Sequence, residues 1–311
     1  MDIFNVLIPG AGGPAGINTI KSLRLSLFKG NIVSTDSNSL SAGFFLSDFY
    51  YIIPPFNDKF FIEKLLKIIK EQNIKVLMPS SGFDIYGYST NYDLIVEAGA
   101  IPIVSRRNVL EICRDKFLSY KFLSNRVPFA FTWASYEKID TFPLIAKPRF
   151  GKGSNNIIKI ENKLDLDYVL RKFKNMIFQE YLPGTEYTVD VLSDLTEKPI
   201  MAIPRIRIDT KAGISVKGKI KRDIMIENLC KKTAETLGIK GPCCIQLKES
   251  KNGELKIIEI NPRLGGGTIF TTLAGANFPA MLLEMASNNN NLIIPNVSEI
   301  TVLRYFEEIV I

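Results

Sequence analysis

Three oxygen-bearing side chains fall at matching positions in two strand-like stretches of the 311-residue chain. The stretches Cys-Ile-Gln-Leu-Lys and Ile-Ile-Glu-Ile-Asn flank Asn252-Gly253, a dipeptide preferred in two-residue hairpin turns. If that turn is used, Gln246 lies directly across from Glu259, and Asn261 projects from the same face two residues further along. Amide and carboxylate oxygens suit Mg²⁺, which commonly sits between such groups and phosphate oxygens. The hairpin therefore predicts a magnesium site, and a polar stripe on a solvated sheet face is the alternative.

The chain contains no histidine. That absence excludes Ser-His-Asp and Cys-His nucleophilic machinery, histidine general bases and every zinc or iron site with a histidine ligand. Any catalysis would depend on lysine, arginine, carboxylates, backbone amides and hard metal ions. Arg263 lies two residues beyond Asn261 and could hold an anion beside the metal.

Two glycine-rich segments could bring backbone amides close to phosphate groups. In residues 144–154 a lysine lies at the end of a strand-like stretch, a proline ends the pairing of that strand, and a Gly-Lys-Gly-Ser loop follows. Such a loop can fold over phosphates while lysines neutralise charge, and a solvated hairpin loop is the alternative. Residues 10–16 follow a strand and open a helix, and Asp36 comes twenty residues after Gly16, close to a dinucleotide fingerprint. A nicotinamide cofactor, a substrate anion and plain turn geometry all stay open for residues 10–16.

The elements that must position these groups divide the chain into three parts. Strand and helix patterns alternate over residues 1–112, which predicts a parallel α/β sheet. Residues 113–184 carry short strands and helices, and the longer alternating strands of residues 185–311 predict an antiparallel sheet. A helix over 222–237 should end at Gly238.

The composition narrows the partners and the compartment. The chain has 39 Lys and Arg against 32 Asp and Glu, a net charge of +7, but its lysines form no dense basic block. We therefore expect no nucleic-acid partner, while a polyanionic small molecule would use the same positive excess. The cysteines lack metal-ligand spacing and fit buried, reduced thiols: Cys113, Cys230, Cys243 and Cys244. With no signal peptide and no apolar run near the roughly 20 residues of a membrane span, we expect a cytoplasmic protein without membrane contact.

Four segments in this order resemble the ATP-grasp superfamily, and within it the branch related to the large subunit of carbamoyl-phosphate synthase. The segments are Lys147 with its glycine loop, residues 178–187, Gln246, and Glu259 to Arg263. The resemblance covers nearly the whole chain. It implies that residues 1–112 form a pre-ATP-grasp domain, residues 113–184 a small lobe with the phosphate loop, and residues 185–311 a large lobe with the metal and substrate site.

The resemblance also implies an activity. A stand-alone carboxylate–amine ligase would activate a small-molecule carboxylate as an acyl phosphate, join it to an amine, and release ADP and phosphate. It would use ATP with two Mg²⁺ ions, for which Mn²⁺ could substitute. Such chemistry needs positioning and charge neutralisation more than covalent help from the protein, which suits a chain without histidine.

The resemblance assigns roles to residues by position. Those that would bind ATP are Lys116 and Lys147 on its phosphates, the loop residues Gly151, Lys152, Gly153 and Ser154, the adenine-binding segment Gln179, Glu180, Tyr181 and Leu182, and Glu186 on the ribose. Those that would hold Mg²⁺ are Gln246, Glu259 and Asn261. Those that would face the transferred phosphoryl group or the substrate carboxylate are Lys147, Arg263, Arg205, Arg207 and Lys211.

One segment departs from the family pattern. Residues 264–268 are Leu-Gly-Gly-Gly-Thr where carbamoyl-phosphate synthase has a serine-rich stretch, so we expect a carboxylate larger than bicarbonate. The partners would be small-molecule carboxylate and amine substrates, and a homodimer is the default assembly. Two other functions stay open. One is a nicotinamide-dependent oxidoreductase that uses residues 10–16, and the other is an ATP-grasp protein that binds nucleotide without turnover.

Overall fold

The N-terminal part of the computed structural model is a parallel sheet with the strand order β3-β2-β1-β4-β5. The structure describes residues 4–80, 82, 84–137, 139–151, 153, 155–287 and 292–311. The strands are β1 (Asn5–Pro9), β2 (Ile32–Asp36), β3 (Phe49–Ile52), β4 (Ile74–Leu77) and β5 (Ile101–Pro102). The helices between them are α1 (Pro14–Arg24), the 3₁₀ helix η1 (Ala42–Leu46), α2 (Phe61–Glu71), α3 (Ile85–Thr90) and α4 (Tyr92–Glu97). The strand order reverses between β1 and β4, and ligands of such sheets bind beyond the carboxyl ends of the strands there.

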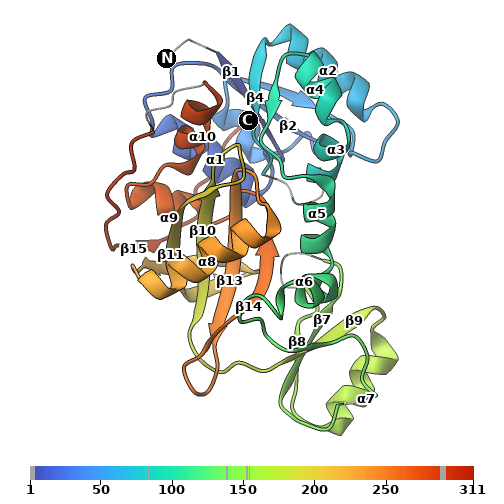
Figure 1. Ribbon diagram of the computed structural model, residues 1–311. Coiled ribbons are helices and arrows are strands. Elements are labelled where there is room, and N and C mark those ends of the chain that lie inside the picture. The colour runs from blue at the N-terminus through green and yellow to red at the C-terminus, as the bar shows by residue number, and fades with distance from the viewer. Residues whose placement is uncertain are drawn as a thin grey trace.

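Two helices then lead into a smaller sheet. They are α5 (Arg107–Arg114) and α6 (Lys116–Leu123). The sheet is antiparallel with the order β6-β9-β7-β8, and its elements are β6 (Thr132–Trp133), β7 (Leu144–Pro148), β8 (Ile158–Ile160), α7 (Lys163–Lys172) and β9 (Met176–Glu180). It has its own apolar core and projects at the lower right of Figure 1.

The largest sheet is antiparallel throughout, with the order β14-β13-β10-β11-β12-β15. Its strands are β10 (Glu186–Ser193), β11 (Pro199–Lys211), β12 (Ile214–Ile220), β13 (Pro242–Glu249), β14 (Leu255–Asn261) and β15 (Thr301–Leu303). Its helices are α8 (Ile224–Leu237), α9 (Thr268–Leu273) and α10 (Phe278–Ala286). As predicted, α8 ends at Gly238, which adopts the left-handed conformation with φ 71°.

One apolar core joins the parallel sheet to the large antiparallel sheet. Ile8 of β1 and Leu23 of α1 belong to the same buried cluster as Ile203 of β11, Phe270 of α9 and Leu282 of α10. Helix α8 covers the opposite face of the large sheet, and α1 lies beside α9 and α10. The predicted fold class, a parallel α/β sheet followed by antiparallel sheets, is confirmed. Because the two large sheets share a core, side chains between them are held in fixed relative positions.

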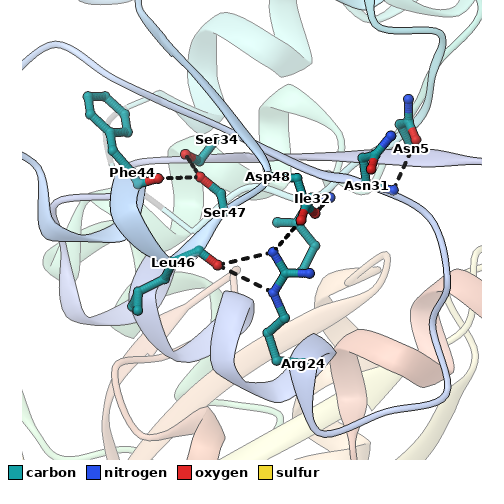
Figure 2. Close-up of polar contacts among 9 residues, drawn as sticks. All are labelled: Asn5, Arg24, Asn31, Ile32, Ser34, Phe44, Leu46, Ser47 and Asp48. Atoms are coloured by element: carbon teal, nitrogen blue, oxygen red, sulfur yellow. Dashed lines mark hydrogen bonds and ion pairs between the residues drawn. The ribbon is translucent and has the colours of Figure 1, made fainter.

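A polar network anchors the segment between β2 and β3 (Figure 2). Asp48 Oδ1 accepts from Arg24 Nη2 of α1 at 2.8 Å, and Asp48 Oδ2 accepts from the backbone N–H of Ile32 at 2.7 Å. The hydroxyls of Ser34 and Ser47 also form a hydrogen bond of 2.7 Å. The segment that contains η1 is thereby fixed against β2 and α1.

Two further expectations concern the thiols and membranes. All four cysteines are buried and unpaired. Within the described part of the chain, no helix is long and apolar enough to cross a membrane.

Candidate active site

The hairpin β13–β14 forms the centre of the candidate site. Gln246 pairs with Glu259 as predicted, but the two-residue turn is wrong. Pairs closer to the turn are shifted by one residue, and Gly253 adopts φ +79°, as in a three-residue loop whose last residue is left-handed. A β-bulge leaves Ile258 without a partner and restores the predicted register beyond it.

Lys147, at the end of β7, points at that bulge. Its ammonium donates to the carbonyl oxygen of Ile258 at 3.0 Å and to Gln179 Oε1 at 2.8 Å. The Gln179 amide is itself oriented, because its Nε2 donates to Thr132 Oγ1 at 3.0 Å. Lys147 is only 4% exposed, and burial lowers its pKa to about 8, with the nearby charge of Glu259 acting in the opposite direction. The predicted phosphate lysine therefore lies beside the predicted metal residue.

The second predicted phosphate lysine, Lys116, reaches the glycine loop. Its Nζ donates to the carbonyl oxygen of Gly151 at 3.1 Å. Asp115 caps helix α6 and also binds Arg149 with both carboxylate oxygens. A cavity of about 430 Å³ is lined by Lys116, Lys147, Gly151 and Glu259, among others. Lys152 and Ser154 lie outside the described residues.

The residues assigned to Mg²⁺ lie on one face of β13 and β14. Asn261 Nδ2 is 3.4 Å from Glu259 Oε1, and Arg263 Nη2 donates to Asn261 Oδ1 at 3.3 Å. One carboxylate and two amide oxygens fit Mg²⁺ that takes its remaining ligands from phosphate and water. Within the described residues no three His, Cys, Asp or Glu side chains gather as a metal cluster. Burial lowers the pKa of Arg263, whose Nη1 is fixed by the carbonyl oxygen of Leu264 at 2.9 Å.

A larger cavity of about 850 Å³ lies between the N-terminal sheet and the large sheet. From the large sheet it is lined by Gln246, Glu259, Asn261, Arg263, Arg205 and Arg207, and from the N-terminal domain by Gly10, Gly12, Gly13, Thr35, Asp36 and Ser41, among others. The N-terminal contribution comes from the carboxyl ends of parallel strands, where the strand order places a ligand site. Glu259 lines both cavities, so the two meet at the candidate metal site.

Arg205 lies buried at the floor of the larger cavity. Its Nη1 donates to Ser215 Oγ at 3.2 Å, its Nη2 is 3.7 Å from Asp190 Oδ2, and its guanidinium lies 5.1 Å from the centre of the Phe270 ring. A larger residue at Gly267 would displace this guanidinium, because a Cβ there would lie 2.1 Å from Arg205 Nη2. The Gly-Gly-Gly segment noted in the sequence thus makes room for a guanidinium.

Several predicted residues line neither cavity. Gln179 acts through Lys147, and Glu186 is ion-paired with Arg207. Glu180 accepts from Lys256 Nζ at 2.9 Å, while Tyr181 and Leu182 follow it along the chain. Lys211 is exposed at the end of β11, with its Nζ 6.0 Å from the centre of the Phe306 ring. The adenine and ribose roles of this segment therefore stay predictions.

Packing explains two of the glycines in residues 10–16, Gly12 and Gly16. A Cβ at Gly16 would lie 2.3 Å from the carbonyl oxygen of Gly10, and a Cβ at Gly12 would lie 2.6 Å from Ser41 Oγ. Close contacts within the protein account for both glycines, so neither requires a dinucleotide. Sequence reasoning missed Ser41 and the hydroxyl of Thr35 at this end of the larger cavity. Thr35 lies within β2 and Ser41 lies five residues beyond its end, so the available signal was a set of polar residues at the carboxyl end of a parallel strand.

Two family models match parts of the chain. A model for the PylC-like N-terminal domain matches residues 6–86, and a model described as ATP-grasp in the biosynthetic pathway with Ter operon matches residues 172–309. The chain carries an ATP-grasp domain. That conclusion confirms the predicted superfamily.

Comparison with curated proteins gives matches to part of this chain or to part of the relative. It is 30% identical over 108 residues to the D-alanine–D-alanine ligase of Thermotoga maritima, a match that covers 32% of this chain and 35% of that one. It is 22% identical over 274 residues to the arginine-specific carbamoyl phosphate synthase large chain of Halalkalibacterium halodurans, which covers 79% of this chain and 25% of that one. The chain thus spans about a third or less of the length of these relatives.

Solved structures match over most of this chain. An L-amino acid ligase from Bacillus licheniformis has a TM-score of 0.69 at 14% identity, covering 92% of this chain and 76% of that one. A second match is the biotin carboxylase domain of Hydrogenobacter thermophilus 2-oxoglutarate carboxylase, solved with MgADP and bicarbonate. Its TM-score is 0.71 at 16% identity, and the match covers 92% of this chain and 70% of that one. Such likeness shows that the fold is shared.

Proposed function

We propose that the chain is an ATP-dependent ligase that activates a small-molecule carboxylate as an acyl phosphate and joins it to an amine, with release of ADP and phosphate. One observation carries the proposal: Glu259 lines both cavities. Lys116 and Lys147 line the cavity on one side of it, and Arg205 and Arg263 line the cavity on the other. Phosphates bound on the lysine side would therefore end beside groups suited to a carboxylate.

The nucleotide half of the site uses the chain's own cations. Lys147 and Lys116 would bind the phosphates, with Gly151 and the rest of the loop above them. The segment Gln179 to Leu182 would hold adenine through its backbone, and Glu186 the ribose. Gln246, Glu259 and Asn261 would hold two Mg²⁺ ions, or Mn²⁺ in their place, and the ions would neutralise charge on the phosphate oxygens. The oxygen-only donor set and the MgADP bound by a structural relative support this assignment.

The substrate half orients the attacking carboxylate. Arg205 is buried, Arg263 is half-buried, and both are held by neighbouring groups, so they would keep a carboxylate and the developing phosphoryl charge in place without rearranging. The carboxylate oxygen would attack the γ-phosphorus, ADP would leave, and an amine would then displace phosphate from the acyl phosphate. The named ligases among the relatives, for D-alanine and for L-amino acids, are consistent with this reaction. We expect the ligase to act in the cytoplasm as a homodimer.

The test is release of ADP from Mg·ATP in the presence of a panel of carboxylates and amines. Glu259→Gln keeps the shape of the side chain but removes its charge, and we expect kcat to fall about hundredfold or more. Glu254→Gln, on an exposed residue of the same hairpin, is the matched control and should leave kcat unchanged. The proposal would be contradicted if Glu259→Gln turned over at the wild-type rate, or if no combination of substrates led to release of ADP.

A further inference from the structure

The larger cavity ends in the N-terminal domain at groups that the proposed phosphoryl transfer does not use. Asp36 ends β2, and its carboxylate is held by two backbone N–H groups, from Gly12 to Oδ2 at 2.8 Å and from Asn38 to Oδ1 at 3.0 Å. Within the described residues this carboxylate forms no ion pair with Lys or Arg, although it lines the cavity. A fixed negative charge with no Lys or Arg partner among the described residues therefore faces the cavity.

Two hydroxyl groups beside Asp36 have no hydrogen-bond partner in the described structure. Ser41 is 2% exposed and Thr35 is fully buried, and both line the same end of the cavity. A Cβ built on Gly12 would lie 2.6 Å from Ser41 Oγ and 3.2 Å from Asp36 Oδ2, so these two oxygens converge on one point. Buried hydroxyls without partners are rare in folded proteins because each costs free energy.

The position of Ser41 is fixed by its surroundings. It immediately precedes η1, the segment that Figure 2 shows tied to β2 and α1 through Asp48 and Ser47. The hydroxyl is therefore held at the cavity end, where a bound group could satisfy it.

The chemistry of this end favours a cation over an anion. The N–H of Gly12, which could otherwise bind an anion, already donates to Asp36. An anion placed there would also be repelled by the Asp36 carboxylate. The guanidinium groups of the cavity lie on the large sheet instead, on Arg205, Arg207 and Arg263. The Asp36 carboxylate and these guanidinium groups thus lie on different walls of the cavity.

We propose that the carboxylate substrate also carries a protonated amine, as an amino acid does, and that Asp36 and Ser41 bind this amine while the arginines of the large sheet face the carboxylate. The inference rests on the proposed function and adds the class of substrate to it. Asp36 supplies the counter-charge, and Ser41 Oγ supplies a second acceptor for the three N–H donors of an ammonium group.

Matched pairs of compounds test the assignment. The probes are L- and D-amino acids, β-alanine and 4-aminobutyrate, each compared with its N-acetyl form and with the deaminated acid of the same skeleton. Binding is measured by calorimetry with Mg²⁺ and a non-hydrolysable ATP analogue. At least one amine-bearing acid should bind about tenfold or more tightly than both of its partners, the difference typical of a lost charge-assisted hydrogen bond.

Variants connect that preference to the named residues. Asp36→Asn keeps an oxygen for the Gly12 N–H, and it should weaken binding of the preferred acid roughly ten- to hundredfold. Ser41→Ala should weaken it several-fold. Asp93→Asn, on an exposed residue of α4, is the control and should change nothing. Thermal unfolding of each variant reports whether the fold is intact.

Each outcome separates this proposal from the one on which it rests. Equal binding of amine-bearing and deaminated acids, no binding of any amine-bearing probe, or an unchanged affinity in folded Asp36→Asn and Ser41→Ala would each overturn the amine site. The ligase would stand in those cases if the protein still bound Mg·ATP and released ADP with another carboxylate. Loss of Mg·ATP binding in the wild type would instead contradict the proposed function.

Discussion

Raising the pH from 7 to 9 should weaken binding of Mg·ATP about tenfold through a single side chain, Lys147. Burial lowers the pKa of Lys147 to about 8 in the free protein, so its ammonium is mostly charged at pH 7 and mostly neutral at pH 9. Only the charged form can neutralise phosphate, and bound phosphate would keep it charged. The apparent affinity is reduced by the fraction of protein in the competent form, which falls from about nine-tenths to about one-tenth.

The assay is calorimetric titration with Mg²⁺ and a non-hydrolysable ATP analogue at several pH values between 7 and 9. Phosphate groups with a second pKa near 6 are already ionised in this range, so the nucleotide adds little pH dependence of its own. Lys147→Met is the matched control, because methionine fills a similar buried volume without a titrating group. Its affinity should be low and constant over the same range.

Two results would refute this reasoning. A wild-type affinity that does not change between pH 7 and 9 would show that Lys147 either stays charged or does not contact phosphate. An equal pH dependence in Lys147→Met would assign the titration to another group. Direct observation of the lysine Nζ resonance in the metal-free protein would distinguish the two explanations of a constant affinity.

Two further predictions concern the stability of the protein and the glycines at positions 266 and 267. The folded pKa of Lys147 is below its unfolded value, so the unfolded chain keeps the proton to a higher pH. The free energy of unfolding of the wild type should therefore rise relative to that of Lys147→Met by about 1.4 kcal/mol per pH unit from pH 8 to 10. A difference in unfolding free energy, measured with denaturant, that stays constant over this pH range would contradict the prediction. Gly267→Ala should lower kcat/KM for the carboxylate about tenfold or more by displacing Arg205, since its Cβ would lie 2.1 Å from Nη2. Gly266→Ala is its control, because the nearest atom there is at 3.5 Å, and equal kinetics in the two variants would refute the steric argument.

The sequence predicted the register of the metal hairpin but not how that register arises. In a regular hairpin, a two-residue turn at Asn252-Gly253 would by itself place Gln246 opposite Glu259. The actual loop has one more residue, and the extra residue at Ile258 on β14 shifts the pairing back. The two differences cancel at the site. The alternation of apolar and polar residues and the preferred turn dipeptide predict which residues pair across the two strands. A bulge depends on what packs against the strand, and a single sequence does not show that.

The N-terminal end of the cavity was the least predictable part. Residues 10–16 and Asp36 suggested a dinucleotide fingerprint because their types and spacing come close to one. The structure shows that Gly12 accommodates Ser41, whose hydroxyl reaches it from a different loop. Arg205 similarly depends on Gly267, 62 residues later in the chain. Such contacts come from tertiary packing, so residue types alone left several interpretations open.

Strand β14 connects the two halves of the site through consecutive residues. It is an edge strand of the large sheet, and two of its carbonyls accept hydrogen bonds from outside that sheet: the Ile257 carbonyl accepts from the Ala130 N–H at 2.9 Å, and the Ile258 carbonyl accepts from Lys147 at 3.0 Å. The next residue is Glu259, which lines both cavities. One strand therefore links Lys147 to Glu259, even though the lysine belongs to the smaller sheet with its own core. A bulge at this point serves the chemistry, because a regular strand would keep the carbonyl of Ile258 in the ladder and away from Lys147.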